Sequence, residues 1–287
     1  MKRLILPVLL LSTVLSINCM AANKNKNIYI QLYSVRNDIK ENFRQTIAKT
    51  AEAGYKGIEA ASYGDGKFYG LAPEDFRKAI EATGMKVLSS HTGKALAEDI
   101  SKTDWNEVWK WWDTAIAAHK AAGMKYIVTA SMPTPKTLAD LKAYCNYYNQ
   151  IGERCQAAGL RFGYHNHSFE FNKIEGETMY DFMLKNTDPA KVFFEMDVYW
   201  TVRGGKSPVD YFNEYPGRFR LLHIKDNKEL GQSGMVGFDA IFRNTDKAGV
   251  KYLVVEVEQY NYAPLTSIKM SFDYLQNNPL VKADYSK

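Results

Sequence analysis

Cysteine is scarce in this chain of 287 residues, which contains three. Cys19 lies in the N-terminal segment, and Cys145 and Cys155 lie in one predicted helix. At a rise of about 1.5 Å per residue, the last two are separated by roughly 15 Å, which is too far for a disulfide bond. We therefore expect both to be small buried apolar residues, and the fold to depend on its hydrophobic core.

Long apolar runs are missing after the first residues of the chain. The opening "MKRLILPVLLLSTVLSINCMAANKNKN" combines a charged start, a short apolar segment over 4–17 and small residues that suit cleavage near Ala21 or Ala22. A spanning helix needs roughly 20 apolar residues. We therefore interpret 1–22 as a cleaved signal peptide rather than a membrane anchor, and 23–287 as the mature domain without a membrane span.

The signal peptide predicts that the mature protein is periplasmic or secreted. Cys19 leaves one alternative open, because a lipoprotein-type cleavage would attach a lipid there and tether the protein by its N-terminus. Asn18, directly before it, is a poor fit to such a cleavage site.

Clusters of positive charge are missing as well. The formal charge is +5, and no run of Lys or Arg with interleaved aromatic residues follows the first few residues. The sequence therefore predicts no nucleic-acid partner. Hydrophobic residues make up 46% of the chain and charged residues 24%, which is typical of a globular protein with a substantial core.

A short phrase recurs along the chain: a small residue, Gly, an apolar residue, Lys or Arg, and then an apolar run. The glycine suits the left-handed end of a helix, and the run suits a buried strand. Copies of the phrase begin at Ala53, Thr83, Ala122, Ala158 and Ala248. Further strand-like runs without the glycine cover 28–36, 191–200 and 218–226.

Helical spacing of apolar residues separates these eight strand-like runs. The predicted helices cover 39–53, 73–83, 105–122, 137–158, 177–186, 207–215, 238–248 and 266–276. Eight strand–helix units predict an α/β fold, a (β/α)₈ TIM barrel in a single domain. The alternative is an open doubly wound sheet, but no Gly-rich phosphate loop follows the first strand.

Polar residues gather late in the apolar strands, where the active site of such a barrel lies. Side chains two residues apart share one face of a strand, so Gly163 is expected to face the barrel interior, whereas Phe162 and Tyr164 face the helices. His119, in a helix, is expected to be a packing or surface residue. The late polar residues are Gln31, Glu59, His91, His165, His167, Asp197, His223, Lys225, Glu256 and Glu258.

Each of these residues alone has an ordinary structural explanation, such as a satisfied core histidine or a carboxylate that holds a loop. Together, imidazoles and carboxylates from several strands would converge at one barrel mouth. Burying so many charged groups without compensation is costly. A divalent cation would compensate them, so the pattern predicts a metal site.

The strand ends "QLYSVR", "GIEAASYG", "SSHTG", "YHNHSFEF", "MDVYW", "HIKD" and "VVEVEQ" resemble those of the xylose-isomerase-like barrel superfamily. This superfamily holds sugar isomerases, epimerases and inosose dehydratases, and the sugar phosphate isomerase/epimerase branch is the most similar in pattern. The resemblance covers essentially the whole mature chain. It implies a divalent metal, commonly manganese, zinc, cobalt or iron, held by residues of the fifth to eighth strands.

The resemblance assigns the metal ligands residue by residue. The family's Asp, His and Glu of the last three strands match Asp197, His223 and Glu256, and His165 stands where the family has a fifth-strand Glu. His167 is an alternative ligand on the same face. Two imidazoles and two carboxylates suit a first-row transition metal. The epimerases often have a His three residues after the metal-binding Asp, whereas this chain has Trp200.

The resemblance implies that the metal acts as a Lewis acid on the enolate of a keto-sugar. Epimerisation, isomerisation and elimination all pass through that enolate. Export favours free sugars or 3-keto-glycosides, and the two departures from the family pattern favour elimination or hydration. Candidate proton-transfer residues are Glu59, His91, His167 and Lys225, and candidate substrate-binding residues are Gln31, Trp200 and Glu258.

Two other classes of function remain alternatives. A non-catalytic carbohydrate-binding barrel would share the fold and the aromatic residues. A metal-dependent endonuclease shares the superfamily but needs more metal ligands and a DNA-binding surface. The sequence leaves the oligomeric state, the substrate and the metal undetermined.

Overall fold

The predicted strand runs form one parallel sheet that curls into a barrel. The computed structural model describes residues 25–287, and its eight-stranded sheet has the order β5-β2-β1-β12-β11-β10-β7-β6. The two end strands meet through a parallel bridge between His91 and Val128 and a hydrogen bond from Lys125 N to Leu88 O of 2.9 Å. The barrel is therefore nearly closed, which confirms the predicted fold and excludes the open sheet.

The barrel strands follow the predicted order along the chain and are short. They are β1 (Ile28–Gln31), β2 (Gly57–Ala60), β5 (Lys86–Ser90), β6 (Tyr126–Thr129), β7 (Arg161–His165), β10 (Val192–Asp197), β11 (Phe219–Lys225) and β12 (Tyr252–Glu256). The predicted signal peptide at 1–22 and Cys19 lie outside the described residues.

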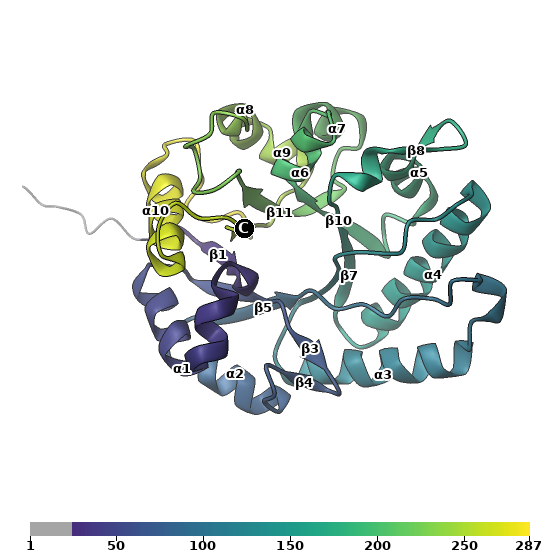
Figure 1. The fold of residues 1–287 in the computed structure, drawn as a ribbon, viewed down its shortest axis with the longest axis horizontal. Helices are drawn as coiled ribbons and strands as arrows, with labels where there is room; N and C mark the ends of the chain where they lie inside the picture. The colour runs from purple at the N-terminus through teal and green to yellow at the C-terminus, as the bar shows by residue number, and fades with distance from the viewer. Residues whose placement is uncertain (1–24) are drawn as a thin grey trace, which may run out of the picture.

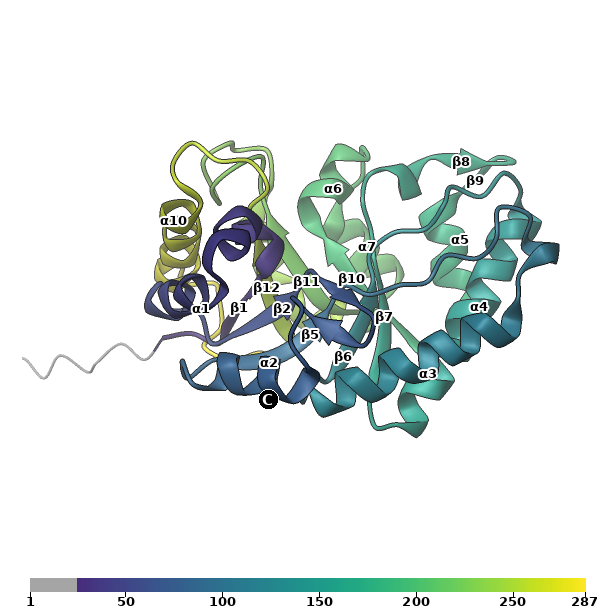
Figure 2. The ribbon, with the colours of Figure 1, turned by 60° about the horizontal axis from the view of Figure 1, so that its bottom comes forward.

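Helices surround the strands on the outside, and the first and last helices lie side by side (Figures 1 and 2). None of the helices within 25–287 is long and apolar enough to cross a membrane. The helices are α1 (Arg36–Glu52), α2 (Pro73–Glu81), α3 (Trp105–Ala121), α4 (Leu138–Ala157), α5 (Met179–Asn186), α6 (Val198–Arg203), α7 (Pro208–Glu214), α8 (Phe238–Arg243), α9 (Thr245–Ala248) and α10 (Pro264–Asn277).

The recurring glycine has the predicted conformation in every copy of the phrase. Each lies just after a helix and has a positive φ, which glycine adopts without steric cost. These residues are Gly54, Gly84, Gly123, Gly159 and Gly249.

Three features differ from the sequence-based expectation. The predicted first-strand run at 28–36 is too long, because β1 ends at Gln31, a 3₁₀ helix (Leu32–Val35) follows and α1 begins at Arg36. The predicted sixth-strand run at 191–200 is too long, because the strand ends at Asp197 and α6 begins at Val198. The Asp197 carboxylate accepts a hydrogen bond from Trp200 N at 2.8 Å and caps the helix. Two small hairpins were also not predicted, namely β3 (Tyr63–Gly64) with β4 (Lys67–Phe68), and β8 (Lys173–Ile174) with β9 (Glu177–Thr178).

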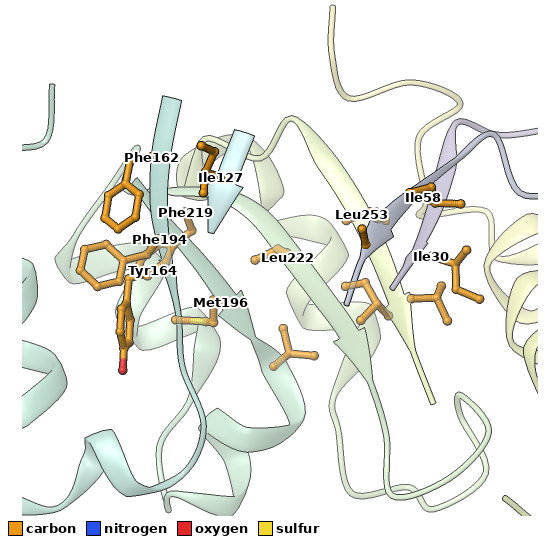
Figure 3. Close-up of a cluster of buried hydrophobic side chains, with 14 of the residues drawn as sticks. Ile30, Ile58, Ile127, Phe162, Tyr164, Phe194, Met196, Phe219, Leu222 and Leu253 are labelled. Atoms are coloured by element: carbon orange, nitrogen blue, oxygen red, sulfur yellow. The ribbon is translucent and has the colours of Figure 1, made fainter. Parts of the chain in front are cut away.

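Most apolar side chains fill the layer between the strands and the helices. Figure 3 shows Phe162 and Tyr164 of β7 beside Phe194 of β10 in this layer. Cys145 and Cys155 of α4 are buried in the same layer and form no disulfide, as predicted.

A second, smaller cluster plugs the inside of the barrel. Gly163 faces this cluster as predicted, because a Cβ atom there would lie 2.5 Å from the ring of Phe193. The absence of a side chain at Gly163 thus makes room for that ring. The plug consists of Tyr29, Leu88, Tyr126, Val128, Phe193, Leu221, Tyr252 and Val254.

His119 of α3 is a packing residue, which was one of the two predicted alternatives. Its side chain is fully buried, with Nε2 2.7 Å from Ser90 Oγ and Nδ1 2.6 Å from Ala115 O. Burial lowers its pKa to about 4. His119 is therefore neutral at physiological pH and takes no direct part in the site described next.

Candidate active site

Above the apolar plug, the inward-facing positions of the strands become polar. On β10, Phe193 belongs to the plug, and Glu195 and Asp197 follow at spacings of two on the same face. The parallel register then aligns polar residues of neighbouring strands, namely Gln31 with Glu59, His165 with Glu195, Asp197 with His223, and Lys225 with Glu256. The late polar residues of the sequence thus meet at the carboxyl end of the barrel.

Two carboxylates and two imidazoles form the deepest part of this polar layer. His91 Nε2 lies 2.9 Å from Glu195 Oε2 and 3.0 Å from Glu59 Oε1. His223 Nε2 lies 2.8 Å from Glu59 Oε1 and 3.3 Å from Glu195 Oε2. The two imidazole rings stack with centroids 5.1 Å apart. Only His91 has measurable exposure, with 16% of its side chain accessible.

Glu59 receives two further hydrogen bonds inside the protein. Gln31 Nε2 donates to Glu59 Oε1 at 2.9 Å, and Ser89 Oγ donates to Oε2 at 2.6 Å. Gln31 Oε1 in turn accepts from Tyr33 N at 3.2 Å. Gln31 and Glu59 are both fully buried. The structure thus places both side chains in a buried hydrogen-bond network, in which Glu59 contacts His91 and His223.

Three of the four predicted metal ligands form one compact group. The ligand atoms of Asp197, His223 and Glu256 lie within 4.8 Å of one another, and all three residues are buried. Asp197 Oδ2 and His223 Nδ1 have no hydrogen-bond partner in the described chain. Because His223 Nε2 already bonds to Glu59 Oε1, its Nδ1 is the atom left free. This is the carboxylate–histidine arrangement that orients metal-binding histidines, so the residues fit a bound divalent cation.

His165, the fourth predicted ligand, belongs to the adjoining group. Its ring centroid is 4.5 Å from that of His223, and its Nδ1 lies 3.3 Å from Glu195 Oε2. This Nδ1 is buried and has no hydrogen-bond partner in the described chain. The potential ligand atoms of His91, His165, Glu195 and His223 also lie within 4.8 Å of one another. His223 is therefore shared between two groups of metal-ligating side chains.

Lys225 lies buried beside the carboxylates at the mouth. Its Nζ is 3.2 Å from Glu256 Oε2 and 2.6 Å from Glu258 Oε2. Glu258 is the more accessible partner, with 30% of its side chain exposed. The ion pairs hold Lys225 in place, so it is the Glu258 carboxylate that remains available to a substrate hydroxyl.

His167 and Trp200 form an aromatic wall at the edge of the site. The His167 ring lies 5.0 Å from that of His165 and 5.8 Å from that of Trp200. The Lys225 ammonium lies 5.7 Å from the Trp200 ring centroid. His167 Nδ1 and Trp200 Nε1 are buried atoms without hydrogen-bond partners in the described chain. Both side chains therefore offer a polar atom to a ligand.

Buried side chains fix the segment that follows His165 at the end of β7 and carries His167. Glu170 is fully buried, accepts from Tyr164 Oη and from His167 N, each at 2.8 Å, and thereby fixes the loop. Asn166 Oδ1 accepts from Asp197 N at 3.2 Å and ties the ends of β7 and β10 together. Burial raises the pKa of Glu170 to about 7.

Burial and neighbouring charges move the pKa values of the imidazoles in opposite directions. Burial by itself lowers the pKa of His91, but the carboxylates of Glu59 and Glu195 raise it to about 10. The pKa of His223 is also raised by neighbouring carboxylates, chiefly that of Glu195, against the effect of burial. Burial lowers the pKa of His165 and of His167. The lowered pKa favours the neutral form of the two histidines at the fifth-strand end, which is the form that binds a metal or accepts a proton, whereas metal binding at His223 would displace a proton.

The pKa values of the buried carboxylates are also shifted in opposite directions. Burial raises the pKa of Asp197 to about 7. Glu256 has a lowered pKa, because the charges of Lys225 and His223 outweigh the effect of burial. The pKa of Glu195 is raised, first by burial and then by the charge of Glu59. The neighbouring cations thus compensate the buried charge of Asp197 incompletely, and a bound cation would relieve it.

Glu195 is the residue of this centre that the sequence-based prediction missed. It lies two residues before Asp197 and thus on the same face of the strand, so the spacing in "FFEMD" could have identified it. Ser89, Asn166 and Glu170 were also missed. No sequence signal marks these three, because their roles depend on which strands and loops become neighbours.

The fold and site can now be compared with known proteins. The family model described as xylose isomerase-like TIM barrel matches residues 47–278. A crystal structure of a sugar phosphate isomerase/epimerase from Parabacteroides distasonis is 35% identical, covers 90% of this chain and 100% of that chain, and superposes with a TM-score of 0.83.

More distant proteins agree with this match. The inosose dehydratase of Lacticaseibacillus casei is 23% identical over 260 residues, which cover 76% of this chain and 82% of that protein. The IolI protein, whose structure contains a zinc atom, is 14% identical, covers 91% of this chain and 100% of that chain, and has a TM-score of 0.68, a likeness of fold. The chain described here belongs to the xylose isomerase-like TIM barrel family.

Proposed function

We propose that this protein is a divalent-metal-dependent enzyme that enolises a keto-sugar and then eliminates the substituent on the carbon β to the ketone. The observation that carries the proposal is the group of Asp197, His223 and Glu256, whose ligand atoms converge at the carboxyl end of the barrel and include the unpartnered Asp197 Oδ2 and His223 Nδ1. The substrate class is supported by the relatives, which include an isomerase/epimerase of sugar phosphates and dehydratases of inosose. From the N-terminal sequence, we also propose that the enzyme is periplasmic or secreted.

Asp197, His223 and Glu256 would hold the cation, with His165 as the fourth ligand. A nitrogen and oxygen donor set of this kind suits manganese, zinc, cobalt or iron. When bound, the cation supplies Lewis-acid stabilisation of the negative charge that develops on the enolate. The zinc atom in the IolI structure supports this assignment.

The chain's own residues provide the proton transfers. His167 is half-buried at the mouth with an unpartnered Nδ1, and it would take the proton from the carbon next to the ketone. The carboxylates of Glu59 and Glu195 bond to His91 Nε2 and favour the protonated imidazole, so His91 Nδ1 would give a proton to the departing oxygen. The C–H bond and the β C–O bond break, a C=C bond forms, and the leaving group departs as water or an alcohol. Trp200 and Glu258 would bind the sugar.

Elimination accounts for the chain's departures from the epimerases better than inversion does. The epimerases of the family that this chain resembles often have a His three residues after the metal-binding Asp, whereas this chain has Trp200 at that position. An indole cannot return a proton to the opposite face of an enolate. Loss of a leaving group needs no such second base, since protonation of the departing oxygen completes the reaction.

Proton exchange with solvent tests the proposal directly. We expect the metal-loaded protein to incorporate deuterium next to the carbonyl when it is incubated in D₂O with free keto-sugars or 3-keto-glycosides. Nuclear magnetic resonance would detect the deuterium, and product analysis would separate epimerisation, isomerisation and elimination. Chelator-treated protein is the control. Absence of exchange and product with every substrate would favour the alternative of a non-catalytic carbohydrate-binding barrel.

Replacing Glu59 by Gln should weaken metal binding although Glu59 is not a ligand. The carboxylate fixes the tautomer and orientation of His223 through its 2.8 Å contact with Nε2, and loss of such a partner typically costs about 10–100-fold in metal affinity. Titration with Mn²⁺ or Zn²⁺ would measure the change. Glu229→Gln is a matched control, since Glu229 is equally buried but bonds to Ser267 and Asn261. Equal affinities in the Glu59 variant and the wild type would refute the orienting role.

A further inference from the structure

The sides of the barrel mouth are lined by different kinds of side chain. Above β7 and β10, the rings of His167 and Phe169 stack with centroids 6.2 Å apart, and Trp200 closes the row. This side of the mouth presents a row of three aromatic rings.

Ion pairs and aromatic rings also fill the side above β11, β12 and β1. Glu258 Oε2 lies 2.6 Å from Lys225 Nζ, and Glu258 O accepts from Arg36 Nη2 at 3.1 Å. Arg36 Nη1 donates to Tyr260 Oη at 2.8 Å, and the guanidinium lies 4.3 Å from the centroid of the Tyr33 ring. These contacts brace one another, so this side is a wall as well.

The side above β5 and β6 is built differently. A pocket of about 560 Å³ adjoins His91 and extends away from the barrel axis over the two strand ends. Small side chains create this space, because the segments after the strands read "HTGKALA" and "ASMPTP". The lining includes Gly93, Ala95, Ala130 and Ser131. A second, outer pocket of about 440 Å³ shares Pro133 with the first, and the two pockets together are called the channel below.

The floor of this channel is fixed. Thr129 Oγ1 donates to Thr92 O at 3.0 Å, and a Cβ atom at Gly93 would lie 3.1 Å from Thr129 Cγ2. The segments that follow β5 and β6 therefore pack closely against each other and form a fixed floor beneath the channel. His91 belongs both to the proton-transfer centre and to the channel lining.

Apart from His91, the lining of the inner pocket is uncharged, whereas the outer pocket also contains Glu98, Lys136 and Asp140. The residues of the pocket next to His91 include hydroxyl groups, Met132 and Pro133, but no Lys or Arg. In the outer pocket, Lys136 Nζ lies 3.6 Å from Glu98 Oε1 and is thus already paired. In the inner pocket a phosphate group would meet no Lys or Arg, whereas a neutral sugar or an aryl group would find both polar and apolar contacts.

We propose that the substrate has two parts, a keto-sugar ring over the polar centre and an uncharged, glycosidically linked group that lies in the channel above β5 and β6. This inference rests on the proposed function and narrows its substrate class from keto-sugars to keto-glycosides. It places the glycosidic oxygen between the sugar ring and the channel, next to His91. The leaving group of the elimination is then the occupant of the channel.

Filling the channel tests this inference. Ser131 is exposed, so Ser131→Trp should fold and should obstruct the channel. We expect kcat/KM for 3-keto-disaccharides and for aryl 3-keto-glycosides to fall at least tenfold, whereas deuterium exchange into a free keto-sugar stays within twofold of the wild type. Ser286→Trp, at an exposed position outside the channel, is the control. Ala130→Phe serves as a second variant should Ser131→Trp fail to fold. Comparison of the disaccharide with the aryl glycoside shows which uncharged group is preferred.

A binding measurement separates this inference from the proposed function. Calorimetry with the unoxidised disaccharide, the corresponding aryl glycoside and the monosaccharide needs no turnover. We expect one of the two-part ligands to bind more tightly than the monosaccharide, and Ser131→Trp to remove the difference. If nothing is turned over but this difference exists, the enzyme proposal fails and the channel assignment stands. Two results would overturn the channel assignment. One is that the wild type binds the two-part ligands no more tightly than the monosaccharide. The other is that Ser131→Trp lowers turnover of the keto-glycosides and exchange into the free keto-sugar to the same extent.

Discussion

Replacing Glu256 by Gln is expected to lower the affinity for divalent cations by more than about 100-fold and to reduce catalysis to background. Glu256 is buried with Asp197 and His223 in the group of converging ligand atoms, and its Oε2 lies 3.6 Å from His223 Nδ1. An amide keeps the shape of the side chain but loses the negative charge. The cation would then face one carboxylate instead of two, together with the nearby Lys225 ammonium.

Metal content after dialysis and titration with Mn²⁺, Zn²⁺ and Co²⁺ would measure this effect independently of activity. Glu258→Gln is the matched control for metal content, since Glu258 also pairs with Lys225 but lies outside the ligand group. Thermal unfolding of both variants would show that the fold is intact. Full metal occupancy in the Glu256 variant would contradict the ligand assignment.

Replacing His167 by Gln is expected to lower kcat by about 10²–10⁴-fold, the range typical for loss of a general acid or base, and to leave the metal in place. His167 lies beyond the end of β7, beside the His165 ring, with an unpartnered Nδ1. Its backbone N–H is held by Glu170 at 2.8 Å. The substitution should therefore remove the proton acceptor without moving the loop.

The matched substitution His165→Gln distinguishes a ligand from a base. We expect this variant to lose metal affinity, because the buried Nδ1 of His165 lies next to His223 in the ligand-bearing layer. Deuterium exchange and metal content would be measured for both variants. The reverse outcome, with metal lost from the His167 variant and retained in the His165 variant, would exchange the two roles.

Local patterns were sufficient for the fold because the units of a (β/α)₈ barrel repeat. Each strand is apolar on both faces and short, and glycines such as Gly54 and Gly159 mark the ends of helices with a positive φ. The period of two along a strand also placed Gly163 under the site and His223 in it. The prediction failed where one side chain had two functions. Asp197 ends a strand and caps a helix, so the run after it resembled a longer strand.

The arrangement of the site depended on contacts between distant strands. Gln31 and Glu59 are late in their strands, as a substrate-binding residue and a proton-transfer residue would be, yet their hydrogen bonds are made inside the protein. Glu195 was missed although its spacing placed it on the inner face. Strand position indicates which face a side chain occupies, whereas depth and partners follow from the stagger of neighbouring strands.

The amino-acid sequence by itself determined the barrel and most of the polar residues at its mouth, because these follow from short-range periodicity. The family was indicated by the resemblance of the strand-end motifs and confirmed by the comparisons. Only the tertiary structure decided which of those residues share ligand atoms, which are hydrogen-bonded below the mouth, and on which side the mouth opens. His223 illustrates the reason. Its Nε2 bonds to Glu59, which lies 164 positions earlier in the chain. That contact leaves Nδ1 free to face Glu256. A pairing of this kind arises when the sheet closes, so no local pattern in the chain records it.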